Sequence, residues 1–248
     1  MKFSLKRPVK IVMLGVGGTG GYAAPHIYRL IHTLNRPARF LVADGDIVEE
    51  KNLVRQNFIH ADLGRNKAAV MAERYASAFG MEIAYLPEFI EDEDTLASLL
   101  TSSAQDRKLP ILIGAVDNNR SRQMCHSVFQ KAKELIYIDS GNGQYTGQVV
   151  CGIRRNGRTY YKPVGTLYPD VLADTGKFPT ELSCAEAAIS APQSVVANVM
   201  AATAVLSYLY DILVLGDITV RSVTFSTKNI HMKPETVKRK KPQKAKVA

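Results

Sequence analysis

The segment Val9–Gly20 reads VKIVMLGVGGTG, and residues 18–33 continue it with a helical pattern. An apolar, β-branched run ends at Gly15, and glycines recur at positions 17, 18 and 20. Glycines here let the backbone turn tightly and approach a phosphate, while the helix start offers free N–H groups and a favourable dipole. This strand, turn and helix predict a nucleotide-binding loop, with a plain packing turn as the alternative.

Short apolar runs alternate with helical patterns beyond this loop. Strands are expected at RFLVAD, EIAYL, PILIGAV and LIYID, and helices at about residues 66–79, 92–104 and 119–134. Such alternation predicts an α/β fold with a doubly wound, Rossmann-like and mainly parallel sheet. Sheets of this type bind ligands at the carboxyl ends of their strands.

The pattern becomes antiparallel in character after Asp139. Two strand-like runs are joined by Asn156 and Gly157, which is a strong hairpin signal. Residues 162–183 contain three prolines and no clear period, which predicts a long loop that is functional or disordered. A helix over 192–215 and a strand, ITVRSVTFS, complete an antiparallel C-terminal extension. Polar residues interrupt this helix, so we expect a buried or interface helix and no membrane span.

Composition and charge indicate one folded domain with a basic tail. The chain has 248 residues, is 46% hydrophobic and carries a net charge of +9. Residues 233–248 hold seven Lys or Arg and one Glu, so +6 of this charge lies there and the remainder of the chain is close to neutral. We expect a domain over 1–232 and a disordered tail over 233–248. The alternative is a tail that makes a salt-sensitive contact with nucleic acid or an acidic partner.

The three cysteines, Cys125, Cys151 and Cys184, include no close pair. Disulfide frameworks and zinc sites need paired cysteines, so neither is expected, and a reducing cytoplasm is the natural location. The first residues show no export signal, because they lack its apolar stretch and cleavage site. Cys125 and Cys151 lie in helical and strand patterns and are expected in the core.

Asp44 ends the strand-like run RFLVAD, where a Rossmann unit places a carboxylate against ribose hydroxyls. The glycine loop and Asp44 alone would suggest an NAD-dependent dehydrogenase, but nothing in the sequence offers a hydride-transfer site. The next segment, DGDIVEEKNLVRQ, leads instead to Arg55 and then Lys67, cationic donors suited to a triphosphate. The alternative is a solvated turn and helix start, with Asn52 as the helix cap.

Together these motifs resemble the ThiF/MoeB/HesA superfamily, the bacterial relatives of ubiquitin-activating enzymes. Its pattern joins a GxGGxG loop to D-x-D-x-V, N-x-x-R-Q, a downstream lysine, a D-N-x-x-x-R element, a Gly-Gln-Val strand start and a cysteine-containing turn before a long helix. The matching residues are Gly15, Gly17, Gly18, Gly20, Asp44, Asp46, Val48, Asn52, Arg55, Gln56, Lys67, Asp117, Asn118, Arg122, Gly147, Gln148, Val149 and Cys184. The likeness spans roughly residues 8–225, although Lys67 is one residue closer to Arg55 than usual and Ala188 replaces a usual glycine.

The resemblance implies an ATP-dependent adenylyltransferase. Such a transferase activates the C-terminal carboxylate of a small ubiquitin-like (β-grasp) or sulfur-carrier-like protein and releases pyrophosphate. In the family the glycine loop cradles phosphate, and the residue matching Asp44 holds the ribose. Those matching Asn52, Arg55 and Lys67 handle the phosphates, and the one matching Asp117 positions magnesium. The implied cofactors are ATP and Mg²⁺, without zinc, because the two CxxC pairs of zinc-containing relatives are absent.

The resemblance also defines the expected site. The nucleotide-binding set is Gly15, Gly17, Gly18, Gly20, Asp44, Asp46, Asn52, Arg55, Gln56, Lys67 and Asn118, and the catalytic set is Arg55, Lys67, Asp117 and Cys184, with Asp117 as the metal ligand. In some relatives a cysteine near position 184 takes the activated acyl group, and in others it is dispensable. A helix start could lower the pKa of this thiol, or Cys184 could be a small buried apolar residue.

Partners follow from the resemblance as well. It implies a homodimer through the long C-terminal helix, and a loop over 162–183 that covers the site and guides the partner protein's flexible tail. This loop, the basic tail and the missing zinc pairs are similar to ThiF-family members of plasmid PRTRC systems. Two alternatives stay open: adenylation of a modified tRNA nucleoside by a dehydratase-type enzyme whose tail grips RNA, and a non-catalytic nucleotide-binding scaffold.

Overall fold

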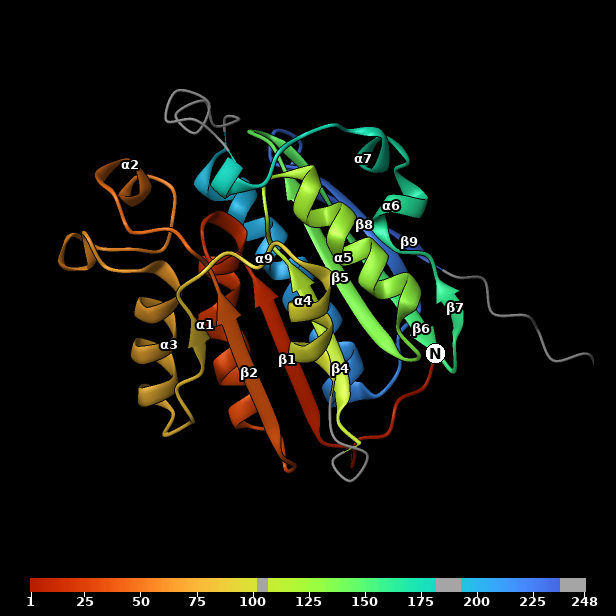
Figure 1. The fold of residues 1–248 in the computed structure, drawn as a ribbon. Coiled ribbons are helices and arrows are strands. Elements are labelled where there is room, and N and C mark those ends of the chain that lie inside the picture. Colours follow the sequence, from red (N-terminus) through yellow and green to blue (C-terminus); the bar gives the residue numbers. More distant parts are fainter. Residues whose placement is uncertain (102–106, 182–192, 237–248) are drawn as a thin grey trace, which may run out of the picture.

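The computed structural model describes residues 1–101, 107–181 and 193–236, in which nine strands form one sheet (Figure 1). The strands are β1 (Val9–Leu14), β2 (Ala38–Ala43), β3 (Tyr85–Leu86), β4 (Leu109–Gly114), β5 (Leu135–Asn142), β6 (Thr146–Arg155), β7 (Arg158–Tyr161), β8 (Val220–Ser226) and β9 (His231–Thr236). The helices are α1 (Gly18–His32), α2 (Glu50–Leu53), α3 (Lys67–Ala78), α4 (Glu93–Leu100), α5 (Asn119–Lys131), α6 (Val164–Leu167), α7 (Asp170–Ala173) and α9 (Val195–Tyr210). Short 3₁₀ turns lie at His60–Asp62 and Pro179–Glu181, and a π-helical turn at Asp211–Leu215.

The strand order is β3-β2-β1-β4-β5-β6-β8-β9, with β7 paired to β6. Strands β1 to β5 pair in parallel, and β6 to β9 pair antiparallel, which confirms the predicted fold class. Leu14 pairs with both Ala43 and Gly114, so the three central strands end at one level. The chain leaves β1 toward β2 and later returns to its other side for β4. The carboxyl ends of β1, β2 and β4 therefore form the switch point at which sheets of this type bind ligands.

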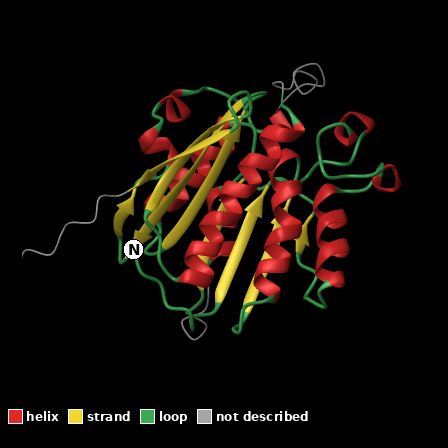
Figure 2. Ribbon diagram, turned by 180° about the vertical axis from the view of Figure 1, so that it is seen from behind, coloured by secondary structure: helices red, strands yellow, loops and turns green. Residues whose placement is uncertain are grey.

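Helices cover both faces of the sheet. Figure 1 shows α4 and α5 in front of the strands, and Figure 2 shows the opposite face, where α1 packs against α9. Side chains of β1 alternate between two cores: Ile11 and Met13 face α1, α3 and α9, whereas Val12 and Leu14 face α4 and α5. Burial on both faces explains why this strand is apolar almost throughout.

Helix starts follow polar side chains that cap them. Asn66, Asp92, Asn118 and Ser194 each accept a hydrogen bond from the backbone N–H three residues later. By contrast, Gly17 precedes α1 and provides no side-chain cap. The first N–H groups of α1 are therefore left for a ligand.

The stretch 162–183, which was expected to be a long loop, is partly helical. Among its described residues it holds α6, α7 and the 3₁₀ turn at Pro179–Glu181. Helices of four residues are too short to show a helical period in the sequence, which is why the prediction missed them. The Gln123 amide of α5 donates to the carbonyls of Val171 and Asp174, at 3.0 and 2.6 Å, and holds this segment on α5.

Residues 233–236, assigned to the disordered tail, belong instead to β9, which pairs with β8. The Glu235 carboxylate accepts hydrogen bonds from the Arg221 guanidinium and, at 2.9 Å, from the Ser222 hydroxyl. Pro234 is tolerated because β9 lies at the edge of the sheet. The composition of residues 233–236 gives no sign of these cross-strand contacts, which is why the prediction assigned these residues to the tail. The rest of the predicted tail, residues 237–248, lies outside the described part of the chain.

The apolar run of α9 continues into the π-helical turn. Residues Val195–Leu215 are long and apolar enough to cross a membrane by length and composition alone, yet half of the tested window is buried in the structure. The core helix of a globular domain passes the same test, and α9 packs on α1, β5, β6 and β8. The side of α9 turned away from the sheet exposes Val195, Val196, Val199 and Tyr210.

Gly15→Ala is expected to destabilise the protein strongly. Gly15 has a φ of +84°, and an added Cβ would lie 2.6 Å from the carbonyl oxygen of Ala115. The positive φ costs a non-glycine residue about 1–2 kcal/mol, and relief of the contact would require backbone movement. Gly80→Ala is the matched control, because Gly80 has a φ of +62° and open space around it. Denaturant unfolding should show the Gly15 variant losing about 1–3 kcal/mol more than the control, and equal losses would contradict this view.

Candidate functional site

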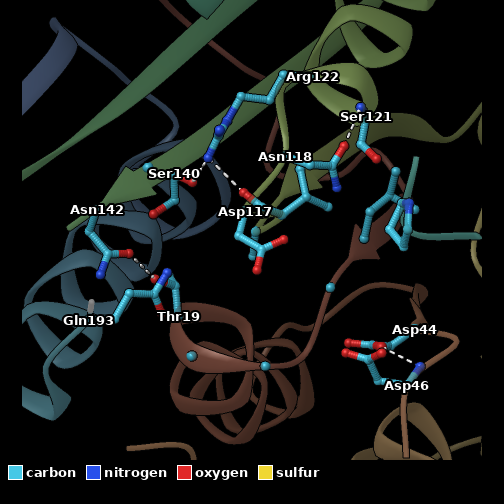
Figure 3. A pocket seen from close by; sticks show the side chains of 18 of the residues that line it. Thr19, Asp44, Asp46, Asp117, Asn118, Ser121, Arg122, Ser140, Asn142 and Gln193 are labelled. Atoms are coloured by element: carbon cyan, nitrogen blue, oxygen red, sulfur yellow. Dashed lines mark hydrogen bonds between the residues drawn. The ribbon is translucent and has the colours of Figure 1, made fainter. Parts of the chain in front are cut away.

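A cavity of about 350 Å³ lies at the carboxyl ends of the central strands (Figure 3). It brings together the glycine loop, the segment after β2, the start of α3 and the loop after β4. The predicted residues that line it are Gly15, Gly17, Gly18, Asp44, Asp46, Arg55, Gln56, Lys67, Asp117 and Asn118. Residues far apart in the sequence thus meet at the switch point of the sheet.

Asp44 ties the glycine loop to the end of β2. One carboxylate oxygen accepts a hydrogen bond from the Val16 N–H at 2.7 Å, and the other accepts one from the Asp46 N–H at 2.9 Å. Burial raises the pKa of the Asp44 carboxyl to about 6, although the charge of Lys67 opposes this shift. Each carboxylate oxygen has a further lone pair, so Asp44 can also accept hydrogen bonds from hydroxyl groups of a ligand.

Lys67 is the first residue of α3 and is only 4% exposed. Its ammonium donates to the Asp46 carboxylate at 2.8 Å. The Asn66 amide donates to the carbonyls of Asp44 and Asp46, at 2.8 and 3.1 Å, and fixes the backbone around both acids. Because an ammonium has three donors, Lys67 can hold Asp46 and an anion in the cavity together.

Arg55 reaches the cavity from the segment after α2, where its guanidinium donates to the Gln193 amide oxygen at 2.8 Å. The Arg55 carbonyl accepts a hydrogen bond from the Asn198 amide at 3.0 Å. Asn198 in turn accepts one from the Asn142 amide, and Asn142 accepts one from the Thr19 hydroxyl, both at 2.9 Å. These bonds link Arg55 to the starts of α1 and α9 and to the end of β5.

Asp117 follows β4, and its carboxylate points into the cavity (Figure 3). It makes no hydrogen bond or ion pair to another residue within the described ranges. Both of its neighbours are held: the Val116 carbonyl accepts from Arg122 at 2.6 Å, and the Asn118 side chain accepts from the Ser121 N–H at 2.7 Å. The Asp117 carboxylate is thereby presented to a ligand by the backbone on either side.

Two residues of the predicted nucleotide-binding set, Asn52 and Gly20, do not line the cavity. Asn52 is buried in α2, and its side-chain oxygen accepts a hydrogen bond from the Glu49 N–H at 2.9 Å. It belongs to the capping box of α2, in which Glu49 and not Asn52 is the cap residue, so the alternative of Asn52 as the helix cap is only close to what the structure has. Gly20 lies inside α1, where any Cβ would collide with the Gly15 carbonyl oxygen. Because Gly20 has no side chain, the first turn of α1 can pack directly against the Gly15 carbonyl, and the glycine loop can close.

The cysteines divide into two groups. Cys125 and Cys151 are free thiols buried in the structure. Burial raises the pKa of the Cys125 thiol to about 12 and raises the pKa of Cys151 as well. Neither thiol is therefore a nucleophile near neutral pH. Cys184 lies outside the described residues.

Several lining residues were not predicted, among them Thr19, Phe89, Asn142 and Gln193. Phe89 follows β3, and its position just after a strand of the parallel sheet is a signal that could have revealed it. Asn142 carries the same signal, because it is the last residue of β5. Gln193 has none, since it is a single amide whose contact is with Arg55, which is distant in sequence.

The fold and the cavity define a class of protein: a Rossmann-type α/β protein with a cationic, acid-bearing cavity at the switch point of its sheet. The model of the ThiF family matches residues 5–247, and this chain belongs to that family. The family match confirms the resemblance seen in the sequence. A search of the curated proteins finds no match.

Solved structures confirm the fold. The selenomethionine crystal structure of PaaA superposes with a TM-score of 0.64 at 17% identity, covering 92% of this chain and 64% of PaaA. The crystal structure of E. coli MccB with ATP superposes with a TM-score of 0.61 at 16% identity, covering 96% of this chain and 65% of MccB. The microcin C7 biosynthetic enzyme MccB with N-formylated MccA gives 0.65 at 17% identity, covering 96% and 67%. This chain thus spans about two thirds of the length of these proteins.

Proposed function

We propose that this protein is an ATP-dependent adenylyltransferase, which activates a carboxylate and releases pyrophosphate. The observation that carries the proposal is a single cavity in which the glycine loop, Arg55 and Lys67 lie with the carboxylate of Asp117, which pairs with no other described residue. Cations for a polyphosphate and an acid for its metal ion are the groups that such a reaction needs. MccB, a structural neighbour, has been crystallised with ATP.

The chemistry requires positioning and charge stabilisation. The substrate carboxylate attacks the α-phosphorus of ATP, the bond to the bridging oxygen breaks, and pyrophosphate leaves with that electron pair. Arg55 and Lys67 would stabilise the negative charge on the phosphates, and the N–H groups at the start of α1 would bind a phosphate oxygen. Asp44 would accept hydrogen bonds from the ribose. No general base is needed, because the attacking group is already a carboxylate.

The donor groups fit a magnesium ion brought in with ATP. Within the ranges that the structure describes, no group of three or more His, Cys, Asp and Glu side chains could hold a metal. Mg²⁺ is commonly bound by one or two carboxylates together with substrate phosphates, and Asp117 supplies such a carboxylate. When bound, the ion would neutralise charge that develops on the phosphates.

We infer that the substrate is the C-terminal carboxylate of a small ubiquitin-like or sulfur-carrier-like protein. MccB has been crystallised with MccA. In this chain the segment after α7 is held at both ends: Asn119 donates to Asp174 at 2.6 Å, and the Thr180 N–H donates to Glu91 at 3.2 Å. Between these anchors Pro179 lines the cavity. In this proposal the segment between Asp174 and Thr180 borders the path along which the partner protein's flexible tail reaches ATP in the cavity.

We also propose a homodimer through α9. Its exposed apolar side, with Val195, Val196, Val199 and Tyr210, is unusual for a helix that otherwise packs into the core. Burying this side against a second copy would remove apolar surface from water. Light scattering on the purified protein tests the assembly, and a monomer at micromolar concentration would contradict it.

The basic residues of the tail favour one second candidate, adenylation of a modified nucleoside in tRNA. Residues 237–248 carry most of the tail's positive charge. Deleting them leaves β9 intact and separates the candidates. Loss of function that tracks salt concentration would favour RNA, whereas unchanged activity would favour a protein substrate.

Pyrophosphate exchange tests the proposed reaction directly. The purified protein, Mg-ATP and the cognate partner should transfer label from pyrophosphate into ATP, because formation of the acyl adenylate is reversible. Exchange that needs the partner's C-terminal carboxylate supports the proposal. A protein that binds both ATP and the partner but exchanges no label would instead be the non-catalytic scaffold.

Asp44 makes the proposed nucleotide site sensitive to pH. The pKa of its carboxyl is raised to about 6, so the group is ionised at pH 7 and largely protonated at pH 5. A protonated Asp44 accepts hydrogen bonds less well, so adenosine should bind about tenfold more weakly at pH 5 than at pH 7. Calorimetry with adenosine measures this without interference from a titrating phosphate. Asp44→Asn should remove the dependence, and unchanged wild-type affinity across this range would contradict the prediction.

A further inference from the structure

A buried ion pair lies at the wall of the cavity: Arg122 lines the cavity and Asp139 does not, and the proposed reaction uses neither directly. The Asp139 side chain on β5 is 1% exposed, and one of its oxygens lies 3.4 Å from the Nε of Arg122 on α5. Its other oxygen accepts a hydrogen bond from the Tyr137 hydroxyl at 2.8 Å. The Arg122 side chain is itself only 12% exposed. Burying two charges costs free energy that the pair regains only in part, so a buried pair is weak evidence for a purely stabilising role.

Arg122 connects this pair to the loop that carries Asp117. One terminal nitrogen of its guanidinium donates to two carbonyls, that of Val116 at 2.6 Å and that of Ser140 at 3.2 Å. The other donates to the Asn119 side chain at 3.1 Å. Arg122 therefore holds the backbone before Asp117 and the Asn119 side chain after it, and it joins this loop to the end of β5. Figure 3 shows Arg122 beside Ser140 and Asp117.

The surroundings hold Arg122 in this place. An added Cβ on Gly141 would lie 3.3 Å from its terminal nitrogen, so the backbone of β5 approaches the guanidinium closely. Asp139 is the one acid within the described ranges that forms an ion pair with Arg122. Without its charge, the guanidinium would keep hydrogen bonds to neutral oxygens alone and would be a largely buried cation with no anionic partner, which is strongly unfavourable.

We propose that Asp139 is a positioning residue, which holds Arg122 so that the loop presents the Asp117 carboxylate to a metal ion bound with the nucleotide. The inference rests on the proposed function, because it deepens the role of Asp117. Outer groups that orient a metal-binding carboxylate typically change metal affinity about 10–100-fold when they are replaced. Asp139 touches neither the nucleotide nor the metal in this scheme.

Asp139→Asn tests the proposal, with Asp62→Asn as a matched control. Asp62 is also buried, at 2% exposed, and pairs with Arg74, but neither residue lines the cavity, and the Asp62 carboxylate accepts a hydrogen bond from the Ile59 N–H. Manganese binding to the full-length protein saturated with a non-hydrolysable ATP analogue is followed by electron paramagnetic resonance. We expect the Asp139 variant to bind Mn²⁺ about tenfold more weakly, while the control variant binds it as the wild type does. Affinity for the analogue without metal should be unchanged in both.

Thermal unfolding separates positioning from general damage, since both variants lose a buried pair and should melt at lower temperatures. Tyr137→Phe keeps the Asp139 charge and should retain wild-type Mn²⁺ affinity. Equal weakening of Mn²⁺ binding in the Asp139 and Asp62 variants, or wild-type affinity in the Asp139 variant, would overturn the proposal. Mn²⁺ binding is measured without turnover, so this result is separate from pyrophosphate exchange, whose absence in the wild type would count against the proposed function alone.

Discussion

Asp117→Ala is expected to reduce pyrophosphate exchange by about a hundredfold or more, because it removes the carboxylate assigned to the metal ion. Asp117 makes no hydrogen bond or ion pair to another described residue, so its loss should leave the stability of the fold nearly unchanged. The measurement is the initial rate of label transfer into ATP at saturating Mg²⁺, alongside thermal unfolding.

Asp94→Ala is a suitable control for this variant. Asp94 is exposed in the first turn of α4 and contributes nothing to the cavity at the carboxyl ends of the strands. It should exchange label at nearly the wild-type rate. An active Asp117 variant would refute the role given to this residue. An inactive wild type, together with an Asp117 variant that binds ATP equally well, would refute the enzyme itself.

Arg55→Ala is expected to weaken Mg-ATP binding by about 10–100-fold, corresponding to the loss of one charge-assisted contact of about 1.5–3 kcal/mol. Calorimetry should show the loss for ATP and little change for adenosine, because Arg55 is assigned to the phosphates. Arg65→Ala is the matched control: Arg65 is exposed, and its guanidinium pairs with Glu73 on α3.

The same titrations, repeated with NAD, distinguish the two classes of nucleotide-binding protein. An adenylating site should prefer Mg-ATP and depend on Arg55. NAD binding that is unaffected by the Arg55 substitution would mean that the protein is a plain Rossmann domain. Magnesium-independent ATP binding of equal strength would count against the metal role of Asp117.

The sequence predicted those parts of the fold that depend on residues close together in the chain. The glycine loop, Asp44 and the alternation of strands and helices were readable because each depends on neighbouring residues. The segment 162–183 was misjudged because α6 and α7 are too short to show periodicity. The first part of the tail was misjudged because β9 depends on Glu235 and its partners on β8.

The candidate site also divides into residues that local motifs predict and residues that they do not. Arg55, Lys67 and Asp117 could be predicted to share a cavity because they belong to recognisable motifs at the ends of strands or the starts of helices. Asn52 belongs to such a motif, yet its side chain is used by its own helix, where it accepts a hydrogen bond from the N–H of the cap residue Glu49. Gln193 could not be found, because its importance comes from a hydrogen bond to Arg55, which is distant in sequence.

The hydrogen bonds that link Thr19, Asn142, Asn198 and the Arg55 carbonyl have a consequence for biosynthesis. They join segments from both ends of the chain, so the order in which the ribosome delivers those segments matters. The N-terminal glycine loop emerges early, yet the side chain that anchors Arg55 arrives only with α9. A nascent chain therefore displays an incomplete cavity for most of its synthesis, and ATP can stabilise the protein only after nearly the whole domain has been released.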